Sequence, residues 1–383
     1  MTLQDTVIPA DQSGPQPDLD PAVEPTLLAL GWRPELSAVF GDQARAGRIP
    51  ARVVAEERGH FVVHDGSATL AATVSGRFRY ESGGDPLAYP AVGDWVAVAR
   101  GAGSDMATIH GLVPRSSAIV RRPPVDHGSG AQILAANVDT VFIVTSLNGE
   151  LNLRRVERYL AVAWESGATP VVILSKADLD DDILGHRVAV EAVAPGVDVI
   201  VASAVSGDGI EDVRACLGSG RTVAFIGSSG VGKSTLVNAL AGHELLTTAG
   251  IREDDARGRH TTTRRQLVPL ADGLVIDTPG MRELGLLDGD GLASVFEDIE
   301  QVAAGCRFSD CRHDSEPGCS IRAALASGEL EPARFAAFRK LEREAHRAEL
   351  STNAVARKAE RRKWTAMIRG VERHLEQKYG PER

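Results

Sequence analysis

The feature that most constrains this chain is a glycine-rich turn between an apolar run and a helical pattern. The run TVAFI at 222–226 is followed by GSSGVGKS, and the helical pattern STLVNALAG begins within that motif. Glycines allow backbone N–H groups to turn onto phosphate oxygens at a helix N-terminus. In this motif the lysine reaches the β- and γ-phosphates and the serine hydroxyl binds Mg²⁺. The sequence therefore predicts an α/β domain that binds a nucleoside triphosphate.

The phosphate-loop residues expected to contact nucleotide extend into the first helical turn. They are Gly227, Ser228, Ser229, Gly230, Val231, Gly232, Lys233, Ser234 and Thr235. Among them, Ser234 is the first predicted Mg²⁺ ligand and Lys233 is the cation expected to assist hydrolysis. A glycine-rich turn without a ligand is the alternative interpretation.

A second motif supplies the remaining metal and γ-phosphate contacts. Asp277-Thr278-Pro279-Gly280 follows the apolar run LVI, so Asp277 would lie at a strand end and hold Mg²⁺ through water. The Gly280 N–H would meet the γ-phosphate. Upstream of this motif lie three threonines, one of which would complete the metal shell: Thr261, Thr262 and Thr263. A surface loop without a ligand remains the alternative for this threonine-containing stretch.

Two further loops are expected to hold the base. Ser175-Lys176-Ala177-Asp178 ends the run PVVIL, and Ser203-Ala204 ends the next run, VDVIVA. A carboxylate such as Asp178 can accept hydrogen bonds from N1–H and the N2 amino group of guanine. Adenine offers neither donor, so a buried, unpaired carboxylate would disfavour ATP. Taken alone, the SKAD sequence is weak evidence, because such a sequence at a strand end is most often an ordinary helix N-cap.

Composition and hydrophobic periodicity divide the chain into five parts. Residues 1–47 are predicted to be a largely disordered arm and lead-in, because the first 25 residues hold five prolines and five acidic residues without Lys or Arg. Residues 48–114 alternate in short runs typical of a barrel of about five antiparallel strands. A linker at 115–132 leads to 133–287, whose βα alternation indicates a mostly parallel sheet. Residues 288–383 follow a helical pattern.

Three cysteines and one histidine stand close together in the C-terminal part. Cys306, Cys311, His313 and Cys319 offer three thiolates and one imidazole, a closed set typical of one structural tetrahedral Zn²⁺. A disulfide would leave one of these cysteines unpaired. The sequence therefore predicts a zinc-binding helical domain, in which the metal organises a segment too small to fold unaided.

The charge of the chain is unevenly distributed. The net charge is −10, but residues 331–383 carry 14 Lys and Arg against 8 Asp and Glu, and the preceding residues sum to −16. An acidic average argues against nucleic-acid binding, whereas the basic C-terminal helix favours it. The predicted RNA-binding residues are Arg357, Lys358, Arg361, Arg362, Lys363 and Trp364. A solvated helix is the alternative.

The order of these motifs is unusual, because both base loops precede the phosphate loop. Ordinary guanine-nucleotide switches have the reverse order, so this is a circular permutation. Together with an N-terminal barrel and a Cys/His cluster, it resembles the ribosome small-subunit-dependent GTPase A family. PAVGDWVAV at 90–98, AANVDTVFIV at 135–144 and GRHTTT at 258–263 add to the resemblance. The resemblance implies an OB-fold barrel, a circularly permuted P-loop GTPase domain and a zinc-binding helical domain.

The resemblance also implies a function. The chain is expected to be a Mg²⁺-dependent GTP phosphohydrolase that binds GTP and GDP, contacts the small ribosomal subunit and its rRNA, and acts late in maturation of that subunit, which stimulates hydrolysis. Neither a long apolar segment nor a secretory signal is readable, so we expect no membrane partner and a location in the cytoplasm. We also expect a monomer. An RNA-binding assembly scaffold that holds guanine nucleotide with negligible turnover is the alternative.

Two positions depart from the usual GTPase pattern. Ser175 stands where the base loop usually has Asn, and a hydroxyl forfeits some contacts to the base and the phosphate loop. Met281 follows the Asp277 motif where many GTPases carry a water-orienting Gln, so intrinsic hydrolysis should be slow. The family is thought to use a first-switch histidine, which matches His260. The predicted catalytic group is His260, Lys233, Thr262 and Thr263; a histidine that merely packs or is solvated is the alternative for His260.

Other features suggest a mechanical link and a possible RNA surface. Residues 281–287 lead directly from the Asp277 motif to the Cys-rich part, so nucleotide state is predicted to reposition that part. Five barrel aromatics could stack on bases or fill the barrel core: Phe61, Phe78, Tyr80, Tyr89 and Trp95. Three linker arginines could contact phosphates or stay solvated: Arg115, Arg121 and Arg122.

Overall fold

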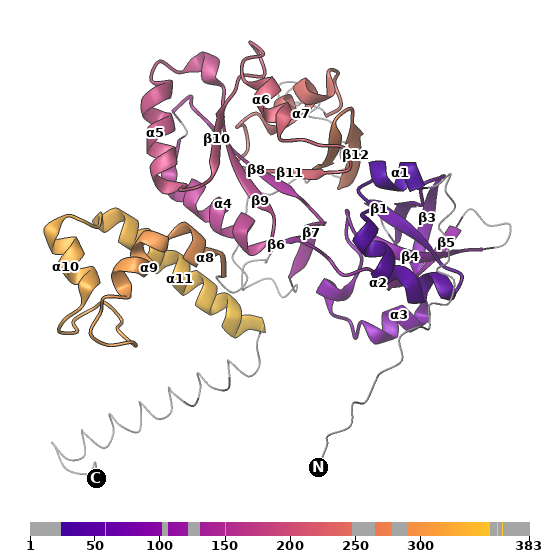
Figure 1. The fold of residues 1–383 in the computed structure, drawn as a ribbon, viewed down its shortest axis with the longest axis horizontal. Coiled ribbons are helices and arrows are strands. Elements are labelled where there is room, and N and C mark those ends of the chain that lie inside the picture. The colour runs from indigo at the N-terminus through magenta and orange to yellow at the C-terminus, as the bar shows by residue number, and fades with distance from the viewer. Residues whose placement is uncertain are drawn as a thin grey trace, which may run out of the picture.

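The structure is a computed structural model in which three parts are distinct (Figure 1). A small barrel and a helical C-terminal module flank a central α/β domain. The residues that the structure describes are 24–57, 59–101, 106–121, 131–149, 151–246, 265–277 and 290–352, with Lys358 and Arg362. Within these ranges, none of the helices is both long and apolar enough to cross a membrane.

The barrel follows the strand order expected of an OB-fold. Its strands are β1 (Ile49–Glu57), β2 (His60–His64), β3 (Thr69–Val74), β4 (Trp95–Arg100) and β5 (Met106–Leu112). They run in the order β1-β2-β3-β5-β4, and β4 pairs with β1 to close the barrel. The β3–β5 pair is parallel, so the expectation of wholly antiparallel strands is wrong for this pair. The short helix α3 (Gly76–Glu81) lies between β3 and β4 in the chain.

The residues just before the barrel are folded. Helices α1 (Glu24–Ala29) and α2 (Pro34–Arg45) precede β1. Leu27, Trp32 and Phe40 form one buried cluster with barrel residues, and the rings of Trp32 and Trp95 meet edge to face at 4.8 Å. The predicted disorder therefore does not extend to 24–45, because the composition argument covered only the first 25 residues and the segment after them holds large apolar side chains whose burial stabilises it. Residues 1–23 lie outside the described ranges.

The central domain is a sheet with helices on both faces. In chain order its elements are β8 (Thr140–Ser146), α4 (Leu153–Glu165), β9 (Thr169–Ser175), the 3-10 helix η3 (Ala177–Leu179), α5 (Ile183–Val193), β10 (Asp198–Val201), α6 (Ile210–Ala215), β11 (Thr222–Ile226), α7 (Lys233–Ala241), β12 (Gln266–Leu270) and β13 (Gly273–Asp277). The order β10-β9-β8-β11-β13 is parallel throughout, and β12 joins antiparallel to β13.

Alternate residues of the parallel strands build two separate cores. Every residue of β8 is buried; Val141 and Ile143 belong to the core beneath α4 and α5. Phe142 belongs to the core beneath α6 and α7, which cover the opposite face (Figure 1). Burial on both faces explains the unbroken apolar runs in the sequence. Because these strands are parallel, their carboxyl ends meet at one edge of the sheet, where ligands of such folds usually bind.

The barrel and the central domain share one sheet. Strand β1 pairs with β12 through Ala55 and Gln266, which makes the sheet continuous over eleven strands. The predicted linker contains structure, since β6 (Ala118–Arg121) and β7 (Gln132–Ala136) form an antiparallel pair. Arg115 in that linker is neither an available phosphate contact nor a solvated side chain. Its guanidinium donates two hydrogen bonds, of 2.8 and 2.7 Å, to the buried carboxylate of Asp94.

The C-terminal module, residues 290–352, is helical. It contains α8 (Asp290–Val295), α9 (Glu297–Ala303), α10 (Ser320–Ser327) and α11 (Pro332–Thr352). Its buried residues Leu292, Phe296 and Phe338 join the same core as α4. Helix α8 crosses α4 so closely that a Cβ on Gly291 would lie 2.0 Å from the Ala161 carbonyl oxygen. A glycine is therefore required at this crossing.

Candidate nucleotide and metal sites

The predicted phosphate loop joins β11 to α7 through backbone conformations that favour glycine. Gly230 and Gly232 have φ values of 83° and 95°. A Cβ on Gly227 would lie 2.3 Å from the Val144 carbonyl oxygen, inside the neighbouring strand β8. The loop can therefore pass close to the sheet and open its backbone N–H groups toward the N-terminus of α7, where an anion is favoured.

Lys233 is the first residue of α7, and its side chain turns back over the loop. Its Nζ donates to the carbonyl oxygens of Gly227, at 2.8 Å, and Ser228, at 2.6 Å. These bonds hold the ammonium group at the loop, where a lysine of this motif reaches β- and γ-phosphates. Ser234 and Thr235 follow in the same half-buried first turn.

Ser175 connects the first base loop to the phosphate loop. Its buried hydroxyl lies 2.6 Å from the Val231 carbonyl oxygen and 3.2 Å from that of Thr145. One hydroxyl hydrogen serves one acceptor at a time, and the shorter distance favours Val231. The replacement of the usual Asn therefore keeps a contact to the phosphate loop, although a hydroxyl cannot donate to both carbonyls together.

The two predicted base loops lie side by side. The Ser203 hydroxyl donates to Asp178 Oδ1 at 2.5 Å and accepts from the N–H groups of Val205 and Ser206, at 3.2 and 3.1 Å. Asp178 is exposed whereas Ser203 is buried, so a fixed hydroxyl orients an accessible carboxylate. Lys176, two residues before Asp178, has a left-handed backbone conformation with φ 58°. Ala204 follows Ser203 in the second base loop. The structure thus brings all the predicted base-loop residues to one place.

Asp277 ends β13, the strand next to β11. The register pairs Ala224 with Ile276, which brings the end of β13 beside the start of the phosphate loop. The other predicted switch and catalytic residues lie outside the described ranges: His260, Thr261, Thr262, Thr263, Gly280 and Met281.

One contact at the phosphate loop had no signal in the sequence. The Arg155 guanidinium on α4 donates to Ser228 Oγ at 2.8 Å. Arg155 lies in the pattern LRRVERYL, where an arginine reads as an ordinary helix-surface residue. The two residues are 73 positions apart, so only the fold brings them together.

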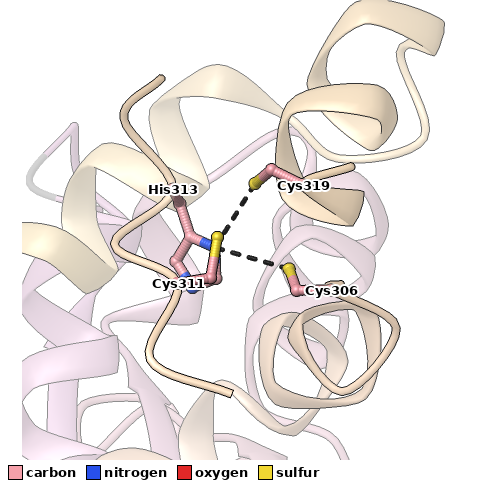
Figure 2. Close-up of side chains that lie close together, drawn as sticks. All are labelled: Cys306, Cys311, His313 and Cys319. Carbon is pink, nitrogen blue, oxygen red and sulfur yellow. Dashed lines mark hydrogen bonds between the residues drawn. The ribbon is translucent and has the colours of Figure 1, made fainter. Parts of the chain in front are cut away.

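The predicted metal ligands converge in the C-terminal module (Figure 2). Cys306 follows α9, Cys319 directly precedes α10, and Cys311 and His313 lie on the loop between them. The ligand atoms of all four lie within 4.8 Å of one another. His313 Nδ1 is 3.4 Å from Cys319 Sγ and 3.6 Å from Cys306 Sγ, facing both as Figure 2 shows.

These separations fit a tetrahedral zinc site. Zn–S and Zn–N bonds of ordinary length place neighbouring ligand atoms about 3.5 to 3.8 Å apart. The loop is further held by Glu316, whose carboxylate accepts hydrogen bonds from the backbone N–H groups of Arg312, Asp314 and Ser315. Backbone N–H donors lower the pKa of Glu316 to about 2, so this carboxylate stays ionised. The Cys₃His cluster could therefore hold one zinc ion.

The predicted RNA-contacting residues are only partly described. Lys358 and Arg362 are exposed, whereas Arg357, Arg361, Lys363 and Trp364 lie outside the described ranges. In the barrel, Trp95 is buried and Phe78 is 9% exposed, so both belong to the packing. Tyr80, on α3, is 87% exposed, so its ring is not part of the packing.

Comparison with known proteins identifies the arrangement. The family model for RsgA GTPase matches residues 112–287. A small ribosomal subunit biogenesis GTPase RsgA 2 of Lactiplantibacillus plantarum is 46% identical over 299 residues, which cover 78% of this chain and 84% of the relative.

Solved structures show the same fold. YjeQ from Thermotoga maritima has a TM-score of 0.57 and 26% identity, over 78% of this chain and 98% of the other. YloQ, described as a circularly permuted GTPase, has a TM-score of 0.54 and 22% identity, over 78% of this chain and 95% of the other. The predicted OB-fold barrel, permuted GTPase fold and C-terminal Cys/His module are thereby confirmed as the fold class.

Proposed function

Because the chain belongs to the RsgA GTPase family, we propose that it is a GTP phosphohydrolase that the small ribosomal subunit stimulates, acting late in maturation of that subunit. The observation that carries the proposal is the meeting of base loop and phosphate loop at one sheet edge. The Ser175 hydroxyl joins the two loops by a hydrogen bond to the Val231 carbonyl oxygen, and Asp178 is oriented by a hydrogen bond from the Ser203 hydroxyl.

Guanine recognition rests on Asp178. An exposed carboxylate with one oxygen held by the Ser203 hydroxyl can accept hydrogen bonds from N1–H and the N2 amino group of guanine. ATP lacks both donors, so the Asp178 carboxylate would face the base with no donor other than the Ser203 hydroxyl, which disfavours ATP. Lys233 and the backbone N–H groups of 227–235 bind the phosphates and stabilise charge that develops on the γ-phosphoryl group.

Mg²⁺ would be held by the Ser234 hydroxyl and, through water, by the Asp277 carboxylate, which are oxygen donors of the kind that this ion prefers. When bound, it neutralises charge on the β- and γ-phosphate oxygens. We assign Thr262 and Thr263 to the γ-phosphate side of the site and His260 to the attacking water. With Met281 unable to orient water, turnover without a partner is expected to be slow.

Zinc would have a structural role. Cys306, Cys311, His313 and Cys319 would fill all four positions of a tetrahedral ion, which leaves none open for substrate. We therefore place the metal in the folding of the C-terminal module and outside the hydrolysis reaction.

The partner would be the small subunit and its rRNA. The predicted basic C-terminal helix, in which Lys358 and Arg362 are exposed, would offer cations for phosphates, and the exposed Tyr80 would offer an aromatic face to a base. We propose that the chain acts as a monomer, and that it acts in the cytoplasm because ribosomal subunits are assembled there.

The decisive experiment compares hydrolysis of GTP and ATP by the full chain with Mg²⁺, with and without purified small subunits. We expect slow GTP turnover alone, strong stimulation by the subunit, and no comparable use of ATP. Asp178→Ala should lose the preference for GTP over ATP. A chain that binds the subunit but shows no stimulated GTP turnover would contradict the proposal and support an assembly scaffold instead.

A further inference from the structure

Helix α4 contacts the phosphate loop and also carries the C-terminal module. It begins at Leu153, after the N-cap Asn152, whose side chain accepts a hydrogen bond of 3.1 Å from the Arg155 N–H. The cap fixes the first turn, and with it the place from which the Arg155 side chain leaves the helix. Figure 1 shows α4 between the sheet and the C-terminal module.

At the loop, Ser228 is held from two sides by two cations. Arg155 donates to its hydroxyl at 2.8 Å, and Lys233 donates to its carbonyl oxygen at 2.6 Å. The second bond belongs to the loop itself, whereas the first comes from a different element. Arg155 therefore adds an external restraint to the residue that follows Gly227, at the point where the loop leaves β11.

At the module, α4 is held by ion pairs to α11 and by close packing. Glu157 is fully buried and accepts from Arg154 at 2.7 Å and from Arg334 of α11 at 2.9 Å. Arg158 also pairs with Glu344 of α11. With the tight crossing at Gly291, these contacts make α4 and the module one packed unit.

We infer that Arg155 is a positioning residue for the phosphate loop, and that α4 relays contacts made at the C-terminal module to this loop. A displacement of the module by a bound partner would act on α4 through the buried Glu157–Arg334 ion pair and through the close crossing of α8 and α4 at Gly291. α4 can pass it to Ser228 through Arg155, a route that does not require movement of residues 278–289. The inference rests on the proposed function, since it concerns stimulation by the small subunit.

The test uses the full chain with Arg155→Ala, Ser228→Ala, the double variant and Arg155→Lys. Ser228→Ala removes the acceptor hydroxyl and keeps the backbone N–H and carbonyl of the loop. Arg187→Ala is the matched control, because Arg187 forms an exposed pair with Glu191 on α5. Each protein is assayed for the Kd of fluorescent GDP, for GTP turnover with and without small subunits, and for melting temperature.

We expect Arg155→Ala and Ser228→Ala each to raise the Kd for GDP about fivefold, because the Arg155–Ser228 hydrogen bond is exposed and an ordinary hydrogen bond contributes only about 1 kcal/mol. The double variant should be no worse than either single variant, and Arg155→Lys should recover part of the loss. The melting temperature should match that of Arg187→Ala. Arg155→Ala should still co-sediment with the subunit, with stimulation lowered at least fivefold.

An unchanged GDP affinity in Arg155→Ala, or additive losses in the double variant, would overturn the positioning role. Full stimulation of Arg155→Ala by the small subunit would overturn the relay. These outcomes differ from failure of the proposed function, which would show in the unsubstituted chain as absent GTP hydrolysis or absent stimulation.

Discussion

The central domain is joined to its two neighbours in contrasting ways. The barrel is attached by a continuous sheet and a buried polar cluster, whereas the C-terminal module is attached by an apolar core with an ion pair inside it. Hydrogen bonds are directional, so the first junction fixes orientation. Apolar contact is non-directional and depends on area, so the second junction gains its precision from the close crossing at Gly291 and from Glu157.

Arg52 is the centre of the barrel junction. It extends from β1 and donates to the Leu30 carbonyl oxygen at 2.8 Å and to the Thr222 hydroxyl at 3.1 Å, while its guanidinium lies over the Trp95 ring. Burial lowers the pKa of Arg52 to about 10, so it stays protonated at neutral pH. Thr222 begins β11, the strand that leads into the phosphate loop, and its N–H donates to Asp139 at 2.8 Å.

Arg334 is the corresponding residue of the module junction. It bridges the buried Glu157 and Asp298, and its guanidinium lies 5.0 Å from the centre of the Phe296 ring. The apolar core around it is shared with α4. Nucleotide-driven repositioning of the Cys-rich part stays a prediction, and this junction constrains it: the module must either carry α4 with it or expose the shared core.

The largest expected effect follows from loss of the proposed zinc ion, which should destabilise the C-terminal module and leave the barrel unchanged. Removing the proposed zinc ion with a chelator, or substituting Cys319→Ala, should unfold residues 306–319 and destabilise the module by several kcal/mol, because we propose that metal binding supplies its folding energy. Hydrogen exchange should rise in the module and stay unchanged in the barrel. Cys216→Ala is the control, because Cys216 directly follows α6 in the connection to β11 and is not part of the Cys/His cluster. Exchange that rises equally in both parts would show that the two junctions are not independent.

The second effect tests the barrel junction. Arg52→Met should lower the free energy of unfolding by about 3 kcal/mol, because carbonyl and hydroxyl acceptors become buried without donors. Chemical denaturation measures it, and Arg45→Met, an exposed arginine on α2, should change stability by less than about 0.5 kcal/mol. Equal stability of the two variants would mean that strand pairing alone holds the barrel.

The third effect tests the module junction. Arg334→Met should cost about 2 kcal/mol, less than the barrel substitution, because Arg154 still pairs with Glu157 and the apolar core remains. Adding Glu157→Gln should restore part of the loss, since no buried charge is then left with a single partner. Arg343→Met, on the exposed side of α11, is the matched control. A double variant less stable than Arg334→Met alone would contradict this account.

Local motifs carried most of what the sequence could predict. The phosphate loop and the Cys/His cluster are each contiguous in the chain, so spacing alone points to their chemistry. Arg52, Arg155 and Arg334 carry no such signal, because their partners lie 170, 73 and 177 positions away. The same limit explains the helices at 24–45 and the parallel β3–β5 pair, which depend on closure of the barrel.

The smallest effect concerns pH at the module junction. Burial raises the pKa of Glu157 above its ordinary value of 4.5, although Arg154 and Arg334 oppose the shift. Between the unfolded and the folded pKa, the native chain holds more protons than the unfolded chain, so this group's contribution to stability falls as pH rises through that window. Glu157→Gln has no such group, so the stability of the unsubstituted chain relative to this variant should decrease with rising pH. The slope of this stability difference against pH should stay below roughly 1.4 kcal/mol per pH unit, the value for release of one whole proton. Denaturation midpoints of both proteins, measured from about pH 5 to 7, would show this, and a relative stability that increases with pH would mean that the arginines outweigh burial.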